Sequence, residues 1–486
     1  MGKTIDLATE VEQLNSVDEN DLILGFNKKA KKVGWMNASH ITKGGYACRR
    51  WNMNHSSPVG EAVGNIEYLR NLPALLGLGC YLVDKNHGRR KLDPTNHYKF
   101  ATGEVAKLDG SMGDYMWGWN TKFYYAWWVE GYYYYEAASL NPIPGKLNYL
   151  IPVASVSAIG PATIDRTNME LVSVINITAQ YRGGDNNASF DGAFNTQLGR
   201  AACKFTAAQA GEYARKKGEG WEAGWYAHHA IISALFRIIF GTRNMQDAVN
   251  PNKDSNGLYQ GGLGAGASDL GSWWSGEEGY NLYPCIPTDA AVDMADGCGE
   301  KVIKVKIKEG TTKDVKIPVF FGLKNFFAYM YHWERGVLIS KKAGGGGDVY
   351  VTPKLYSSYS ISSLAGMTKV SEIPAAKVAS QWEYVSQLSM QHLCHKPTVT
   401  AGTASTFYAD GFYNDNAVSG LRVPLVSANG DNGSICGPEY VNANNDGSWS
   451  NANYGVLLNF WAWACPLPCL LREMQPHPMV KNQLLM

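Results

Sequence analysis

Glycine and aromatic residues together set the narrowest limits on how this chain can fold. It contains 52 Gly and 58 aromatic residues (15 Trp, 28 Tyr and 15 Phe), while only 18% of its residues are charged. This combination suits many short strands joined by long ordered loops, because glycine permits tight turns and aromatic rings fill a core between sheets. It argues against a helical bundle and against a disordered chain. The length of 486 residues predicts two or three domains.

The charge balance excludes partners that are held by bulk electrostatics. The net charge is only +1, so no basic field exists to hold a nucleic-acid backbone or an anionic membrane. The most apolar segment, residues 456–471, contains Asn459 and is broken by Pro466 and Pro468. We therefore expect a buried strand and an irregular tail there, with no membrane insertion. The first residues lack the apolar core of a signal peptide, which predicts synthesis in a cytoplasm.

The first 155 residues divide into two parts by composition. Residues 1–45 are rich in lysine, and DLILGF, NKKAKK and VGWMNASHI predict strand, polar turn and strand. Two strands alone are only marginally stable, so we expect this module to be stabilised by copies of itself or by a larger assembly. Residues 46–155 form an aromatic-rich β region that includes FYYAWWVEGYYYYE. Two interpretations of that run stay open: core strands under long loops, or a surface on which sugar rings stack.

Two helices and one strand pair are predicted from local signals. Thr206 and Gln209 form a capping-box pattern before AGEYARKK, and Gly218 lies where a helix would end. A second apolar helical stretch runs from Tyr226 to Phe240 and is followed by Gly241. KVIKVKIKEG and KDVKIPVFF alternate as a pair of strands would, and AGGGGD (343–348) is interpreted as a turn between strands.

No motif predicts catalysis, a metal or a cofactor. GLGAGASDLG does not follow a convincing strand, and it precedes Trp-Trp where a dinucleotide loop would open a helix. The nine cysteines are scattered and odd in number, so they do not form a disulfide framework. Zinc ligands could be offered by His392, Cys394, His395 and Cys436, but their spacing matches no common structural site. Calcium ligands could be offered by four acids that we interpret instead as solvated loop residues: Asp410, Asp415, Glu439 and Asp446.

The segment 427–453 is the strongest candidate for a binding function. Seven of its 27 residues are Asn and four are Ser, with two aromatic residues among them. Amides and hydroxyls provide adaptable hydrogen bonds and aromatic rings provide rigid contact area, which is the composition of recognition loops. The alternative is that Asn, Gly and Ser simply make turns. The candidate ligand-binding residues are Asn429, Asn432, Tyr440, Asn442, Asn444, Asn445, Asp446, Trp449, Asn451 and Asn453.

Several segments also resemble a known family. In order, they are IGPATIDR, the stretch from LGRAACKF to FGTRNMQDA, IPVFFGLKNFF, and the stretch from GLRVPLVSA to SNANYGVLLNF. They resemble the C-type-lectin-like domains of phage and prophage structural proteins, which share the fold of formylglycine-generating enzymes. The resemblance covers residues 156–465. It implies an α+β fold with two helices, many short strands and long Gly/Asn-rich loops, preceded here by a β-rich N-terminal region. Residues 466–486 form a tail that departs from the family and would pack on a neighbouring copy.

The resemblance implies binding without catalysis. The enzyme branch carries two cysteines a few residues apart just before the final loop, whereas Cys436 is alone there, so we expect no enzyme. The implied function is that of a phage virion protein, made in the host cytoplasm, that forms a tail or head fibre or spike. Its N-terminal module would bind other virion proteins, and its lectin-like body would attach to a bacterial surface glycan or protein, as a homotrimer that gains from multivalency. The alternatives are a purely structural capsid or tail protein, a formylglycine-type oxidase and a bacterial adhesin.

Overall fold

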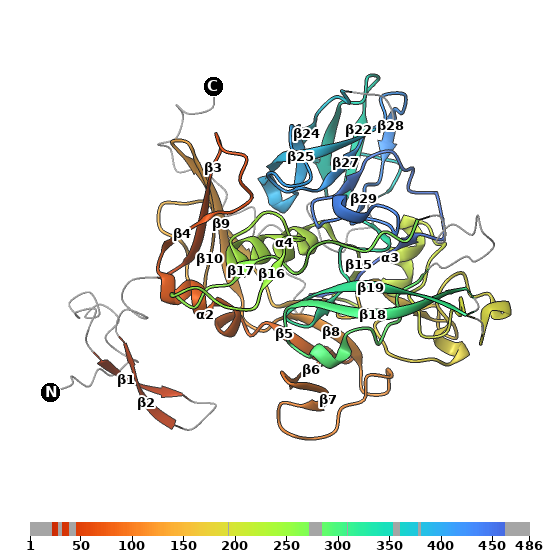
Figure 1. Cartoon of the computed structure of the whole chain (residues 1–486), viewed down its shortest axis with the longest axis horizontal. Helices are drawn as coiled ribbons and strands as arrows, with labels where there is room; N and C mark the ends of the chain where they lie inside the picture. Colours follow the sequence, from red (N-terminus) through yellow and green to blue (C-terminus); the bar gives the residue numbers. More distant parts are fainter. Residues whose placement is uncertain are drawn as a thin grey trace.

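Short strands dominate the structure, as the glycine and aromatic content predicts (Figure 1). This computed structural model describes residues 22–27, 32–37, 45–192, 194–271, 284–308, 310–352, 360–377 and 381–461. Within these ranges the α-helices are α2 (Ile66–Leu76), α3 (Ala207–Arg215) and α4 (Tyr226–Phe240). A mostly β architecture with few helices agrees with the expected α+β class at this coarse level.

The two predicted helices form where their local signals lie. Thr206 Oγ1 accepts a hydrogen bond from Gln209 N while Gln209 Oε1 accepts one from Thr206 N, so the capping box at the start of α3 is confirmed. Helix α4 ends at Gly241, whose φ of 72° places it in the left-handed region. Every side chain of α4 is buried, and the helix packs against strands of the five-stranded sheet.

Helix α2 was not predicted. Asn65 caps it by accepting a hydrogen bond from Tyr68 N, and Gly77 ends it with a φ of 68°. Pro73 lies inside the helix, and because proline usually ends or kinks a helix, the sequence does not predict one here. Its apolar side nevertheless buries Leu69, Leu72 and Leu76, so tertiary packing outweighs the local cost of the proline.

A seven-stranded sheet joins strands from the first third of the chain to the last described strand. Its last described strand, β32, lies between β12 and β15 and pairs with both in antiparallel fashion. The domain boundary expected at 155/156 falls inside β12, so residues 46–155 and 156–465 share one sheet, and their expected separation is corrected. In sheet order the strands are β15 (Trp221–Ala223), β32 (Leu458–Trp461), β12 (Ala154–Ser157), β8 (Asp114–Trp119), β5 (Gly79–Val83), β6 (Arg89–Asp93) and β7 (Asn96–Phe100).

The aromatic run FYYAWWVEGYYYYE forms the hairpin β9–β10 of a five-stranded sheet. Tyr125 and Tyr134 are buried on the side that faces α4, whereas Trp128 and Tyr135 stack at 4.9 Å and are only partly buried. One face of the hairpin therefore belongs to the core, as the first interpretation predicts, and the other carries rings that pack on each other; sugar stacking on that face stays a prediction. In sheet order the strands are β11 (Asn148–Ile151), β9 (Phe123–Glu130), β10 (Tyr133–Ser139), β3 (Ala47–Asn52) and β4 (Glu61–Gly64).

The second half of the chain adds two larger sheets and a long hairpin. The four-stranded sheet has the order β24 (Thr368–Ile373), β23 (Gly347–Val351), β22 (Val337–Lys341) and β28 (Gly420–Arg422). The other seven-stranded sheet has the order β26 (Lys396–Thr400), β25 (Trp382–Ser389), β27 (Gly411–Tyr413), β30 (Val441–Asn442), β29 (Leu425–Val426), β21 (Tyr331–Trp333) and β31 (Tyr454–Gly455). The predicted strand pair is confirmed as β18 (Gly299–Lys308) and β19 (Thr311–Phe320), with β20 (Leu323–Lys324) beside β19. The segment 343–346 joins β22 to β23, as predicted.

The remaining strands form small pairs. The N-terminal hairpin predicted in residues 1–45 is present as β1 (Leu22–Asn27) and β2 (Lys32–Asn37). Residues 1–21, 28–31 and 38–44 of that module, and the tail 466–486, lie outside the described residues. Two further pairs are β13 (Thr163–Asp165) with β14 (Glu170–Val172), and β16 (Val249–Asn250) with β17 (Gln260–Gly261).

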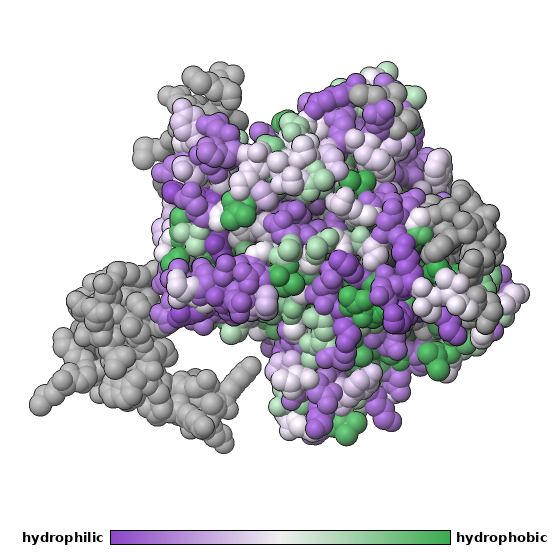
Figure 2. Space-filling model, in the orientation of Figure 1, coloured by the Kyte–Doolittle hydropathy of each residue, from purple (hydrophilic) through white to green (hydrophobic). Residues whose placement is uncertain are grey.

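The surface is mixed in polarity. On the face shown in Figure 2, apolar residues are scattered among hydrophilic ones and do not gather in one patch. Among the described residues, no helix has both the length and the apolar character needed to cross a membrane.

Candidate ligand-binding site

The segment 427–453 joins strands of one sheet and is anchored at both ends. It leaves β29, forms one turn of 3-10 helix (Gly433–Ile435), adds β30 to the same sheet and returns as β31. β30 pairs with β29 and with β27, so the middle of the segment is fixed by the sheet. The segment thus has a framework part and an exposed part, and the ten predicted site residues fall into both.

Four of the predicted site residues are buried. Tyr440 has no exposed surface; its ring packs 4.8 Å from that of Trp382, and its hydroxyl lies 2.7 Å from the Tyr331 hydroxyl. The expectation that Tyr440 stacks on a ligand is therefore corrected, because a ring that fills the core cannot also receive a sugar. Three amides are buried as well and do not face outward as expected: Asn429, Asn445 and Asn453. Of these, Asn445 Oδ1 accepts a hydrogen bond from the Tyr454 hydroxyl at 2.8 Å.

Three further amides are partly buried and build turns. Asn432 Oδ1 accepts hydrogen bonds from Asn429 N at 3.1 Å and from the Tyr331 hydroxyl at 3.2 Å. Asn442 Oδ1 accepts from Asn444 N at 3.0 Å. These contacts support the simpler interpretation of the Asn-rich composition, that the side chains organise turns.

Asn444 has the clearest framework role of these three amides. Its Oδ1 accepts a hydrogen bond from Lys341 Nζ at 2.7 Å and another from Asp415 N at 3.0 Å. Lys341 is buried, and burial lowers the pKa of its ammonium group to about 8. The amide oxygen therefore helps to solvate a buried cation, which ties β22 to the segment.

Replacing Asn444 with alanine should lower the free energy of unfolding by about 1–3 kcal/mol, because it leaves a buried donor with one partner fewer. Urea denaturation of the full chain measures this. Asn451→Ala, at an exposed position of the same segment, is the matched control and should change the stability little. Equal stability of the two variants would show that Asn444 has no framework role.

The most exposed of the predicted site residues lie at the tip 446–451. Trp449 is 57% exposed, and Asn451 is exposed beside it. Asp446 Oδ1 accepts from Ser448 N at 2.9 Å, and Asp446 O accepts from Trp449 N at 3.0 Å, so the tip is a closed turn. Its two ends are held at the start of α3, where Gly447 O accepts from Ala207 N and Asn451 O accepts from Lys204 N, both at 3.1 Å. Asp446, Trp449 and Asn451 are therefore the predicted residues that the structure brings together on the surface.

A buried charge cluster lies behind the segment and was not predicted. The Arg237 guanidinium of α4 donates to both carboxylate oxygens of Glu136, at 2.6 and 2.8 Å, and to Glu439 Oε1. Burial alone would raise the pKa of Glu439, but Arg237 and His395 hold it at about 2. No spacing in the sequence connects these residues, which lie in different parts of the chain.

Two of the acids interpreted as solvated loop residues are in fact buried. Asp410 Oδ2 accepts a hydrogen bond from Glu439 N at 2.7 Å. Burial, followed by the charge of Glu439, raises the pKa of Asp410 well above its ordinary value. Because burial opposes ionisation of Asp410 and Glu439 is paired with Arg237, these two acids do not act as the solvated loop carboxylates that the sequence predicts.

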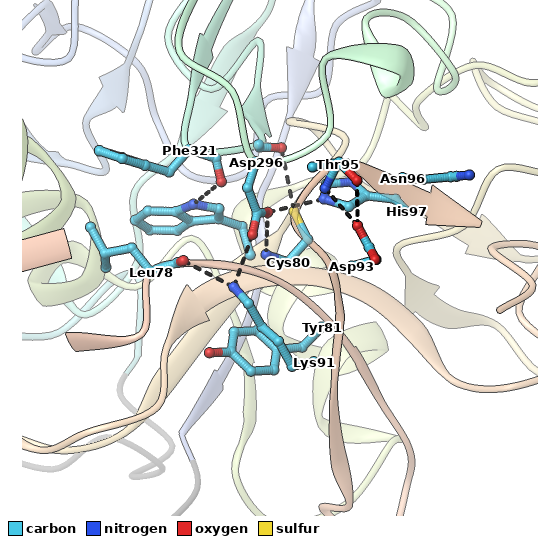
Figure 3. A network of polar contacts seen from close by, with 12 residues as sticks. Leu78, Cys80, Tyr81, Lys91, Asp93, Thr95, Asn96, His97, Asp296 and Phe321 are labelled. Atoms are coloured by element: carbon cyan, nitrogen blue, oxygen red, sulfur yellow. Dashed lines mark hydrogen bonds and ion pairs between the residues drawn. The ribbon is translucent and has the colours of Figure 1, made fainter. Parts of the chain in front are cut away.

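The grouping of possible metal ligands in the described residues is Cys80, His97 and Asp296, none of which is among the four residues considered for zinc in the sequence analysis. Figure 3 shows that Asp296 is already occupied, since it accepts from Cys80 N at 2.9 Å and lies 3.0 Å from both His97 Nε2 and Lys91 Nζ. Burial raises the pKa of the Cys80 thiol to about 12, so a thiolate is not available. Because the Lys91 ammonium already supplies the positive charge that a metal ion would bring to Asp296, we interpret this network as a structural contact between β5, β7 and the loop before β18.

Comparisons with known proteins add no assignment. No protein-family model matches the chain, and a sequence search of curated proteins finds no match. The resemblance to phage lectin-like domains therefore stays a prediction.

Proposed function

We propose that the protein is a non-catalytic component of a phage virion, a tail or head fibre or spike, that attaches to a bacterial surface glycan through the tip 446–451. The resemblance of residues 156–465 to phage C-type-lectin-like domains supports the virion assignment. The exposure of Trp449 on a tip whose base is fixed by backbone hydrogen bonds supports the binding assignment. The host cytoplasm would be the site of synthesis, and the N-terminal module would bind other virion proteins.

The chemistry of the tip suits a sugar. An indole ring covers the C–H face of a pyranose, and amide and carboxylate groups beside it, here those of Asn451 and Asp446, pair with hydroxyls. Because the tip is held at both ends, little conformational entropy is lost when a ligand binds. Affinity at one such small site is modest, and a homotrimer would raise it through simultaneous attachment of several tips.

A purely structural role is the second candidate, and one observation favours it. Most of the Asn side chains in the segment serve the protein's own packing, and the hairpin β9–β10 carries exposed apolar residues, Val129 and Tyr132, that another subunit could cover. In this case the tip would bind nothing, and Tyr132 would lie at a contact between copies.

Replacing Trp449 with alanine tests the binding role. We expect at least a tenfold loss of affinity, about 1.4 kcal/mol, for the bacterial polysaccharide that the unmodified chain selects from an immobilised panel, because the stacking surface is removed. Tyr98→Ala, at an exposed ring on β7, is the matched control and should bind normally. Binding by Trp449→Ala that equals that of the unmodified chain would refute the role of the tip.

A further inference from the structure

A second concave site lies at the other end of α3. It is an open cleft of about 430 Å³, within the range of roughly 300–1,000 Å³ that is typical of small-molecule sites. It lies where β5 ends and β8 begins, and the hairpin β13–β14 forms another wall (β5 and β8 in Figure 1). Its lining residues are Asp84, Lys85, Gly110, Ser111, Met112, Gly113, Asp114, Asp165, Glu170, Val172, Val174, Tyr181 and Lys217.

The inner part of the cleft contains fixed charges. The side chains of Lys217 and Asp114 are 2% and 6% exposed and form an ion pair of 2.7 Å. Asp114 Oδ1 also accepts from Ser173 N at 2.8 Å, which fixes the carboxylate. An ammonium group carries three N–H donors, and among the described residues the Lys217 ammonium has Asp114 as its one ion-pair partner. The ammonium also lies 4.9 Å from the centre of the Trp221 ring, and because it lines the cleft it can donate one further N–H to a ligand there.

A second buried acid contributes an acceptor. Asp165 is 6% exposed. Burial alone would raise its pKa, but hydrogen bonds from Asn168 and Gln180 lower it, so the carboxylate is ionised at neutral pH. Glu170 lies on the same side and is paired with Lys85 at 2.8 Å. Acceptors thus face the cleft from the β13–β14 hairpin as well as from β8.

The remaining wall is apolar. Val172 and Val174 are buried beneath the cleft, and Met112 and Tyr181 contribute partly exposed surfaces at its edge. Burial, followed by the negative charges of Asp165 and Asp114, raises the pKa of the Tyr181 hydroxyl, so it stays a neutral donor. A ligand that fits must therefore combine an apolar face with several hydroxyls.

The charge balance selects among such ligands. Four carboxylates and two ammonium groups line the cleft, so its net charge is negative and an anionic ligand is repelled. We propose that this cleft binds a single neutral pyranose residue of a glycan, with Asp114, Asp165 and Lys217 pairing with hydroxyls and Tyr181 and Met112 covering the C–H face. This site lies outside the segment 427–453 and does not require binding at Trp449.

The two sites are separated by one helix. The tip 446–451 contacts the start of α3, whereas Lys217 follows its end. A helix of nine residues spans about 14 Å. A single sugar cannot occupy both sites, so variants in the cleft and variants in the tip can be told apart.

The test is saturation-transfer NMR on the full chain with five separate probes: the methyl glycosides of glucose, galactose, mannose and N-acetylglucosamine, and the acidic sugar N-acetylneuraminic acid. We expect saturation of at least one neutral glycoside, with a dissociation constant on the order of 1 mM because the ligand is small, and none of the acidic sugar. Tyr181→Ala should weaken that binding at least tenfold, and Met112→Trp should block it by filling the cleft. The part of the saturation that Met112→Trp removes should be the same in the presence of Trp449→Ala and of the exposed-ring control Tyr132→Ala, because a sugar bound at the tip 446–451 does not contact Met112.

Each other outcome overturns the proposal. If none of the neutral glycosides is saturated, the cleft is not a site for a single pyranose. If Trp449→Ala abolishes the binding while Met112→Trp does not, the sugar binds at the tip, which supports the proposed function and refutes this inference. If calcium chloride alone shifts the resonances of residues around the cleft and no sugar does, the cleft is a cation site.

Discussion

Replacing Arg237 with alanine should lower the free energy of unfolding by about 3–5 kcal/mol, because it leaves two buried carboxylates without their cation. Arg237 donates to Glu136 of the five-stranded sheet and to Glu439 of the segment 427–453, and all three side chains are at most 2% exposed. The two carboxylates would remain buried without the guanidinium that pairs with both of them; His395 lies 3.8 Å from Glu439, but burial lowers the pKa of its imidazole. Chemical denaturation of the full chain at neutral pH measures the loss.

A matched variant separates the loss of charge from the loss of packing. In the triple variant Arg237→Met, Glu136→Gln, Glu439→Gln the charges are removed together, and we expect it to recover much of the stability, since a neutral core of similar volume tolerates the loss of an ion cluster. Lys304→Ala, which breaks the exposed pair with Asp314, should leave the unfolding midpoint nearly unchanged. If the triple variant is as unstable as Arg237→Ala, unpaired charge is not the cause.

The stability should also fall steeply as the pH is lowered below 6.5, because two histidines are buried in their neutral form. Burial lowers the pKa of His228 well below its ordinary value of 6.5, and it lowers that of His332 to about 3. Below pH 6.5 these two imidazoles therefore become protonated in the unfolded chain while they stay neutral in the folded chain. Each histidine then costs about 1.4 kcal/mol per pH unit, until the pH reaches its folded pKa.

His228→Phe isolates one of these contributions. The His228 ring stacks 3.9 Å from that of Trp461, and neither of its nitrogens has a hydrogen-bond partner in the structure. A phenyl ring fits the same stack without a buried polar atom, so the variant should be at least as stable at pH 7.5. Between pH 6.5 and 5.5 its stability should fall by about 1 kcal/mol less than that of the unmodified chain, because the unfolded imidazole is already half protonated at pH 6.5. Urea titrations at these pH values measure the difference, and His55→Phe, at an exposed histidine, is the control. If the stabilities of His228→Phe and the unmodified chain fall in parallel as the pH is lowered, the buried imidazole is not held neutral.

Elements with local signals could be predicted from the sequence, and elements with distant partners could not. The capping box at Thr206 and the glycine after Phe240 identify α3 and α4, because the groups that start and end a helix lie within a few residues of it. Alternation identifies the β18–β19 hairpin for the same reason. The pairing of β32 with β12 has no such signal, and the domain boundary was therefore placed inside a sheet.

The candidate site shows the same limit at the level of single residues. Asn and aromatic residues serve both recognition loops and buried turns, so composition alone does not separate Trp449 from Tyr440. What separates them is the position of Tyr331 and Trp382, which come from other strands and enclose Tyr440. The cleft at the end of α3 was missed because its lining residues come from five stretches of the chain, none of which has a motif.

The position of β32 dictates when the protein can finish folding. A nascent chain holds β12 and β15 long before Leu458 is synthesised, yet these strands are joined only through β32. Until Trp461 has left the ribosome, both strands present unpaired backbone edges, which are the usual sites of aggregation. The seven-stranded sheet therefore cannot be completed before β32 has been synthesised and is free to pair with β12 and β15.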